Sequence, residues 1–170
     1  AAVIMQKKIM IVMEIAQQKW TVQMFAVDQL LKMNVVSAMV QALMTELKMP
    51  ADRFWFTGGV PEADLATFYR TASAYVSLSE HEGFCVPLLE AMAADVPVLA
   101  YAATAVPETL GEAGVQFAPK NLEYAAELLG LLVYDDDLRA SVLAGQRARL
   151  ADFSDAAMRA RLARLIARFS

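Results

Sequence analysis

The chain has 170 residues, a formal net charge of -4 and an apolar fraction of 58%. This length suits a single domain with a sizeable core, and the acidic balance gives no general attraction for nucleic acid. The longest apolar runs, such as 9–13 and 96–103, fall short of the roughly 20 residues that cross a bilayer. One cysteine and one histidine exclude an internal disulfide and a structural zinc site. We expect a soluble domain in a reducing compartment, without a transmembrane segment.

The composition changes near residue 52. Residues 1–52 contain eight of the ten methionines and five of the six lysines, but no arginine and no glycine. All nine arginines and all seven glycines follow. The change marks either a domain boundary or a first segment of different origin, and about 50 residues is small for an independent core. The sequence leaves both interpretations open.

The first part of the chain predicts two strands and two helices. Residues 9–15 are apolar and rich in β-branched side chains, which indicates a buried strand. Helices are predicted at 20–32 and 36–48, the second ending before Pro50. Residues 53–57 predict a further strand, which stops at a pair of glycines.

From residue 61 onward, short apolar strands alternate with helices. A helix is predicted at 61–72, because proline and acidic residues are favourable in a first helical turn. The later predicted elements are, in order, a strand at 74–78, a helix at 86–94, a strand at 96–101, a helical turn at 107–108, a strand at 115–118, and helices from 122 almost to the end with caps near 135–137 and at Ser154.

A left-handed residue is predicted where the helix at 86–94 ends. Helices often end with a residue of positive φ, and aspartate tolerates this conformation better than most residues. Asp95 occupies that position. We therefore expect a positive φ at Asp95.

The alternation of short strands with helices of ten or more residues indicates βαβ units. The predicted fold class is α/β, with a Rossmann-like parallel sheet covered by helices on both faces. Ligands of such sheets bind beyond the carboxyl ends of the strands. We expect the loops after residues 15, 57 and 78 to converge on one site.

The segment 79–90 is expected to form an anion-binding helix start. Pro87 lies in the first turn, where its missing N–H costs nothing. Gly83 either lets the backbone approach a ligand or adopts a positive φ. An open helix N-terminus can hold a phosphate or hydrogen-bond sugar hydroxyls. The backbone amides expected there are those of Phe84, Cys85 and Val86.

Two carboxylates flank this helix start. Glu82 lies in the loop before it, and Glu90 lies about one turn into the helix. Carboxylates on either side of a phosphate-holding helix start suit a ligand with hydroxyls at both ends. A nucleoside diphosphate sugar, such as a UDP- or GDP-sugar, is a ligand of this kind.

The segment E-G-F-C-V-P-L-L-E-A-M-A at 82–93 is similar to the Glu-x7-Glu signature of retaining glycosyltransferases with the two-domain GT-B fold, of the family 4 or group 1 type. The segments R-F-W-F-T-G-G-V, A-Y-V-S-L-S-E-H-E-G-F, V-P-V-L-A-Y and V-P-E-T-L-G-E-A-G-V resemble the carboxyl-terminal, donor-binding domain of that family in the same order. The resemblance covers 53–170 and leaves 1–52 atypical. It implies that 1–170 form a single sugar-nucleotide-binding domain.

The resemblance implies roles for the motif residues. Glu82 would lie beside the donor sugar and stabilise the reacting geometry, and Glu90 would accept hydrogen bonds from the ribose. The sugar hydroxyls and phosphate oxygens would be held by Gly83 and the amides of Phe84, Cys85 and Val86. The base would be bordered by Gly58, Gly59 and Val60. No metal or other cofactor is implied, because cationic side chains and the helix terminus neutralise the diphosphate.

Two positions near the first strand bear on the diphosphate. Members of the family carry an arginine and, five residues later, a lysine after this strand. Glu14 and Lys19 stand at that spacing. Lys19 matches and is expected to bind the donor, whereas Glu14 reverses the charge. Replacing Glu14 by arginine is therefore predicted to raise diphosphate affinity about tenfold.

The resemblance also implies a partner domain. A two-domain fold needs about twice this chain if each half is of typical size, so the amino-terminal acceptor domain is missing and the isolated half is expected to be inactive alone. The Arg-rich last helix has leucine and isoleucine on one face, and in the family a carboxyl-terminal helix crosses back to the other domain. The implied location is the cytoplasm, or the membrane surface through the absent half.

Other interpretations stay open. Glu82 and Glu90 could be a solvated acid and an ordinary acid at a helix N-terminus. Cys85, close to His81, could be a nucleophile activated by the helix start. The alternative functions are a nucleotide-sugar epimerase or a phosphorylase of related fold, and a non-catalytic or engineered half-domain that binds nucleotide without turnover.

Overall fold

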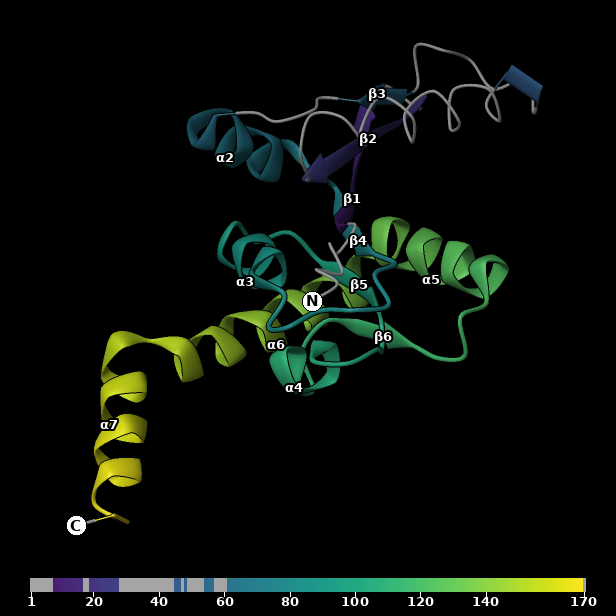
Figure 1. Ribbon diagram of the computed structural model, residues 1–170. Coiled ribbons are helices and arrows are strands. Elements are labelled where there is room, and N and C mark those ends of the chain that lie inside the picture. The colour runs from purple at the N-terminus through teal and green to yellow at the C-terminus, as the bar shows by residue number, and fades with distance from the viewer. Residues whose placement is uncertain are drawn as a thin grey trace, which may run out of the picture.

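The structure is a computed structural model, and it describes residues 8–16, 19–27, 45–46, 48, 54–56 and 61–169. Over these residues the chain forms a six-stranded sheet in the order β3-β2-β1-β4-β5-β6, with helices on both of its faces (Figure 1). This strand order is that of dinucleotide-binding folds. The predicted α/β class and Rossmann-like architecture are confirmed.

The elements follow the predicted order closely. The strands are β1 (Lys8–Ala16), β2 (Lys19–Val27), β3 (Phe54–Phe56), β4 (Ala74–Ser77), β5 (Val98–Tyr101) and β6 (Val115–Phe117). The helices are α2 (Glu62–Thr71), α3 (Val86–Ala93), α4 (Val106–Leu110), α5 (Leu122–Tyr134), α6 (Asp136–Leu150) and α7 (Asp155–Ile166), and a 3-10 turn (Ala151–Phe153) precedes α7. All predicted elements from residue 61 onward are confirmed, as are the strands at 9–15 and 53–57.

The predicted helix at 20–32 is wrong over residues 20–27, which lie in a strand, β2 (Lys19–Val27). This strand pairs antiparallel with β1 from Lys8↔Val27 to Ala16↔Lys19. The segment K-W-T-V-Q-M-F-A-V is rich in aromatic and β-branched residues, which favour strands. Most of the predicted helix at 36–48 lies outside the described residues; within it, residues 45–46 are helical.

The sheet is parallel only in part. β4, β5 and β6 run parallel, as do β2 and β3. β1 runs antiparallel to both of its neighbours, β2 and β4. Only two residues separate β1 from β2, whereas a parallel pair needs a crossover of a dozen or more residues. The short connection therefore forces β1 and β2 to pair antiparallel, which the sequence analysis did not predict.

The core lies in two layers, one on each face of β4 and β5. Successive strand residues point to opposite faces, so Tyr75 and Val98 pack with α2, α3 and α4, whereas Val76 and Leu99 pack against α5. Figure 1 shows α3 and α5 on opposite sides of these strands. The two layers fix the carboxyl ends of β4 and β5, where the site lies.

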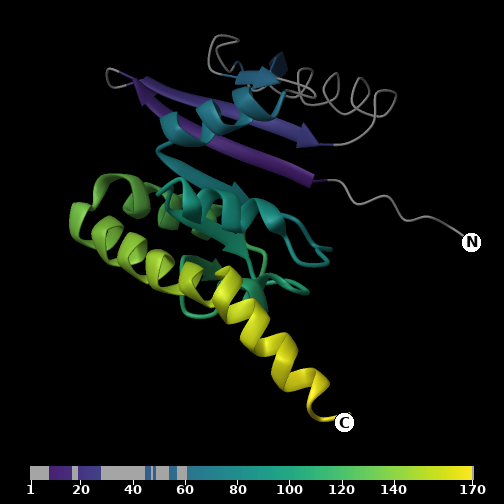
Figure 2. The same cartoon turned by 90° about the vertical axis from the view of Figure 1, so that its left-hand side faces the viewer.

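The last three helices begin at side-chain caps, as predicted near 135–137 and at Ser154. Each cap accepts a hydrogen bond from a backbone N–H in the first turn, and the caps are Asn121, Asp135 and Ser154. α7 then extends away from the sheet (Figure 2). None of the helices in the described ranges combines the length and the apolar character of a membrane span.

The positive φ predicted at Asp95 is confirmed, with a value of 57°. The Asp95 carboxylate also accepts a hydrogen bond from Arg147 Nε at 2.7 Å, a contact that the sequence does not predict. Asp95→Gly and Asp95→Ala both remove this ion pair, so their difference reports the backbone alone. We expect the glycine variant to be more stable by about 1 kcal/mol, measured by urea denaturation. Equal midpoints would show that Asp95 is not strained.

Candidate functional site

The site begins where β4 ends. A loop at 78–85 leads into α3, which starts at Val86 with Pro87 in its first turn, as predicted. The N-cap residue Cys85 is left-handed (φ 59°, ψ 59°), and its side chain makes no capping hydrogen bond. α3 shares this lack of a side-chain cap with α2 and α4, whereas the first turns of α5, α6 and α7 are capped by side chains. The backbone N–H groups of its first turn lie at the positive end of the helix dipole and can bind an anion from outside the helix.

The loop before α3 is held by the next elements along the chain. The backbone N–H of Glu82 donates to Thr104 Oγ1 at 2.9 Å, and the hydroxyl of Thr109 on α4 donates to the Phe84 carbonyl at 2.7 Å. Thr104 is itself left-handed, with φ 47°. Cys85 and Thr104 are thus two strained residues of one loop cluster, and such residues concentrate at functional sites.

The two predicted carboxylates differ in their surroundings. Glu82 is only 6% exposed, which rules out the solvated acid that was its alternative interpretation. Glu90 is exposed on α3 and accepts a hydrogen bond from the Tyr69 hydroxyl at 3.0 Å. It lies beyond the first turn of α3, and the helix dipole acts mainly within that turn. The interpretation as an ordinary N-terminal acid therefore does not account for Glu90.

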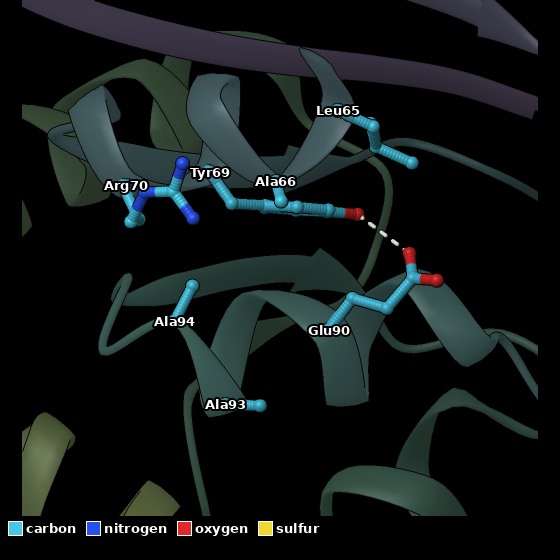
Figure 3. A pocket seen from close by; sticks show the side chains of 7 residues that line it. All are labelled: Leu65, Ala66, Tyr69, Arg70, Glu90, Ala93 and Ala94. Carbon is cyan, nitrogen blue, oxygen red and sulfur yellow. Dashed lines mark hydrogen bonds between the residues drawn. The ribbon is translucent and has the colours of Figure 1, made fainter. Parts of the chain in front are cut away.

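A cavity of about 380 Å³ opens beside Glu90 between α2 and α3 (Figure 3). The small alanine side chains on both helices keep it open. Its lining residues are Leu65, Ala66, Tyr69, Arg70, Glu90, Ala93 and Ala94. The sequence did not predict this cavity, because its walls come from two helices that are not adjacent in the chain.

Lys120, between β6 and α5, brings a cation to the same loop. Its Nζ donates to the Leu78 carbonyl at 2.9 Å and to Glu80 Oε1 at 2.8 Å. These contacts hold the pKa of the Glu80 carboxyl below its usual value. The ammonium also lies 5.3 Å from the centre of the Tyr101 ring. Sequence reasoning missed Lys120; the available signal was its place just after the last predicted strand.

The family comparison agrees with this geometry. The family described as "Glycosyl transferases group 1" matches residues 37–149. The chain belongs to this family. The match includes the loop before α3, both carboxylates and the elements that hold them.

Curated relatives of this group 1 domain are mannosyltransferases. It is 34% identical over 99 residues to O-antigen chain mannosyltransferase B of Escherichia coli, a match that covers 58% of this chain and 26% of that protein. It is 30% identical over 99 residues to the serotype-specific mannosyltransferase WbdA of Escherichia coli, covering 12% of that protein. The match therefore spans about a quarter, or less, of the curated relatives' length.

Solved structures share the fold. The carboxyl-terminal domain of the glycosyl transferase group 1 protein LpcC from Francisella tularensis has a TM-score of 0.62 at 25% identity, covering 72% of this chain and 64% of that one. HepE from Anabaena, solved with UDP and glucose, has a TM-score of 0.70 at 19% identity, covering 83% and 39%. These likenesses confirm a domain of the GT-B type.

The structure tests two alternative interpretations of this loop, those of Gly83 and Cys85. Gly83 is exposed, its φ lies outside the left-handed region, and an added Cβ would meet nothing within 4 Å. The positive-φ interpretation is therefore wrong, and open space for a ligand remains. Cys85 is 2% exposed within the core, whereas His81 is exposed. A buried thiol of this kind does not support the nucleophile interpretation. Among the described residues, no cluster of three or more His, Cys, Asp or Glu side chains could hold a metal ion.

The base-bordering residues Gly58, Gly59 and Val60 lie outside the described residues. The strand that precedes them in the chain, β3, ends at Phe56. β3 is parallel to β2, and both β2 and β4 are antiparallel to β1. The carboxyl end of β3 is therefore at the same edge as that of β4, which agrees with the expected convergence of these two loops.

The expected convergence of the loop after residue 15 is wrong. β1 is antiparallel to β4, with Met10 opposite Ser77 and Met13 opposite Ala74. Ala16 and Lys19, which follow along β1 and β2, therefore lie toward the amino end of β4. The structure does not bring Lys19 to the edge that carries Glu82 and Glu90, because β1 runs antiparallel to β4 and ends near the amino end of that strand.

This topology reverses the expectation for Glu14. Glu14 is opposite Thr21 in the β1–β2 pair and lies toward the same amino-end edge as Lys19. Replacing Glu14 by arginine should leave the affinity for GDP or UDP unchanged in titration calorimetry at low salt, where a charge contact is least screened. A tenfold gain would show that the first segment approaches the diphosphate and that β1 runs parallel to β4.

Proposed function

We propose that this chain is the donor-binding half of a retaining glycosyltransferase, which takes a sugar from a nucleoside diphosphate sugar. The observation that carries the proposal is the start of α3, without a side-chain cap, between the buried Glu82 and the exposed Glu90. A helix N-terminus suits phosphates, and carboxylates suit sugar hydroxyls. Retention is supported by the Glu-x7-Glu spacing. Because the curated relatives are mannosyltransferases, a nucleoside diphosphate mannose is the first donor to test.

The proposed roles follow the order of the residues from the loop before α3 to the second turn of that helix. Glu82, buried before the helix, faces the donor sugar and stabilises the reacting geometry. Glu90, on the second turn, accepts hydrogen bonds from the ribose. The phosphates lie between them, at Gly83 and the amides of Phe84, Cys85 and Val86. We propose that no metal is needed, because the helix dipole and fixed donors stabilise the diphosphate charge.

The acceptor site belongs in this proposal to a separate amino-terminal domain, without which this half is inactive. An apolar stripe on and just after α7 supports this part of the proposal. The large side chains of the stripe are between 45 and 87% exposed. Such a surface is typical of an interface. The stripe consists of Met158, Leu162, Leu165, Ile166 and Phe169. We also propose a cytoplasmic location, since a single cysteine, which forms no internal disulfide, suits a reducing compartment.

Titration calorimetry with GDP, UDP and the matching nucleosides tests the function. We expect one diphosphate to bind, the nucleoside without phosphates to bind more weakly, and EDTA to leave both affinities unchanged. If neither GDP nor UDP bound, the proposal would be overturned in favour of a half-domain that binds no nucleotide. Loss of binding in EDTA would overturn the metal-free arrangement alone.

A further inference from the structure

The hydroxyl of Tyr69 connects α2 to the proposed ribose contact on α3. It donates to Glu90 Oε2 at 3.0 Å across the cavity between the two helices (Figure 3). A longer contact of 3.5 Å reaches the Pro87 carbonyl. The other carboxylate oxygen of Glu90 points away from Tyr69. One oxygen is thus held by the protein, and the other points away from this contact.

Tyr69 is a rigid support for this hydrogen bond. Its side chain is 4% exposed and belongs to the same core cluster as Leu88 of α3. Its ring centre lies 6.2 Å from that of Tyr75 on β4. Burial raises the pKa of Tyr69, and the nearby Tyr75 and Glu90 add to the rise. The hydroxyl therefore stays protonated and remains a hydrogen-bond donor at any ordinary pH.

Glu90, in contrast, is an exposed, long side chain. A carboxylate that moves among rotamers loses that freedom when a ligand fixes it, which weakens binding. The bond from Tyr69 restricts Glu90 before a ligand arrives, so this loss is reduced. A carboxylate can accept about four hydrogen bonds. One bond from Tyr69 therefore leaves enough acceptor capacity for two neighbouring sugar hydroxyls.

We propose that Tyr69 is a positioning residue that makes the site select ribonucleotides over deoxyribonucleotides. The assignment rests on the proposed function, in which Glu90 accepts hydrogen bonds from the ribose. Tyr69 acts through Glu90, by holding the carboxylate where the vicinal hydroxyls of a ribose meet it. A ligand without one of these hydroxyls leaves the fixed acceptor without its donor, and sites built in this way reject such ligands strongly.

The variant Tyr69→Phe tests this role, because phenylalanine keeps the packing and removes only the donor. The ligands are GDP, UDP and their 2′-deoxy and 3′-deoxy forms, measured by titration calorimetry. We expect the wild-type domain to prefer the ribonucleotide by about tenfold or more. In Tyr69→Phe this preference should fall by about three- to tenfold, because ribonucleotide binding weakens more than that of the deoxynucleotides, which keep a single hydroxyl for Glu90.

Two further variants separate positioning from packing. Tyr75→Phe removes another buried hydroxyl of the same core cluster and should leave the preference unchanged. In a Glu90→Ala background, Tyr69→Phe should cause no further loss of ribonucleotide affinity, because the group that it positions is absent. This comparison retains its meaning even if Tyr69→Phe lowers the stability of the fold.

The outcomes distinguish this role from the proposed function. If the wild type binds a diphosphate and Tyr69→Phe keeps the full ribonucleotide preference, or weakens both ligand types equally, the positioning role is wrong. If the wild type binds GDP and UDP no more tightly than their 2′-deoxy and 3′-deoxy forms, the positioning role is wrong. The proposed diphosphate site is not affected by that result. If no nucleoside diphosphate binds the wild type, the proposed function itself fails and the assignment with it.

Discussion

Glu90→Ala should weaken nucleoside diphosphate binding by about 1.5 to 3 kcal/mol, or roughly 10- to 100-fold, the scale of hydrogen bonds to a charged group. Glu90 is exposed on the second turn of α3 and already holds one hydrogen bond from Tyr69. In the proposed complex the ribose hydroxyls donate to the same carboxylate. Titration calorimetry with GDP and UDP measures the loss directly, and the deoxynucleotides should lose less.

Glu82→Gln is the matched comparison, because it keeps the volume of a buried side chain and removes its charge. Glu82 precedes α3 and faces the sugar in the proposed complex, so its variant should bind the diphosphate about as well as the wild type does. Its effect should appear only with the complete donor, a nucleoside diphosphate sugar. Equal losses from both variants with GDP or UDP, or no loss from either, would contradict the division of roles between Glu82 and Glu90.

The features of the site that could be predicted are those that depend on residues close together in the sequence. Pro87, near the start of an apolar helix, specifies where α3 begins through local backbone chemistry alone. Asp95 at the helix end was predicted to be left-handed for the same kind of reason and has φ 57°. Local signals of this type do not depend on which elements later pack together.

Contacts between distant residues could not be predicted in this way. Tyr69 and Glu90 are 21 residues apart, and Glu82 and Thr104 are 22 apart. Nothing in either sequence neighbourhood specifies the partner, which depends on how α2, α3 and the loop after β5 pack. The helix predicted at 20–32 is wrong for a different reason. The aromatic and β-branched residues of 19–27 favour a strand, and a strand that pairs with β1 is what the structure shows.

Gln146→Ala should lower the free energy of unfolding by about 2 to 6 kcal/mol, since it leaves two buried backbone groups without their partner, each at a cost of about 1 to 3 kcal/mol. Gln146 is fully buried on α6. Its Oε1 accepts from the Val98 N–H at 2.9 Å, and its Nε2 donates to the Val96 carbonyl at 2.8 Å. These two bonds fasten α6 to the start of β5 across about 50 residues of chain. Urea denaturation measures the change.

Gln116→Ala provides the comparison, because Gln116 also donates to a carbonyl, that of Gly111 at 2.8 Å, but is only half-buried. Water can replace that contact, so the loss should be about 1 kcal/mol or less. If Gln146→Ala cost no more than Gln116→Ala, α6 would not be held to β5 through its glutamine, and packing alone would position it.

Gln146→Glu adds a test of the donor alone. Glutamate keeps an acceptor for the Val98 N–H, but when ionised it has no donor for the Val96 carbonyl and places a charge in the core. Burial should raise its folded-state pKa above the unfolded value of about 4.3. The protonated acid restores an O–H donor, so the penalty should be small below about pH 4 and should grow as the pH rises above the unfolded value. Wild-type protein, with an uncharged amide at this position, gives the reference curve. A Gln146→Glu variant whose difference from wild type did not change between pH 4 and 7 would show that residue 146 is hydrated and does not fasten α6 through a buried donor.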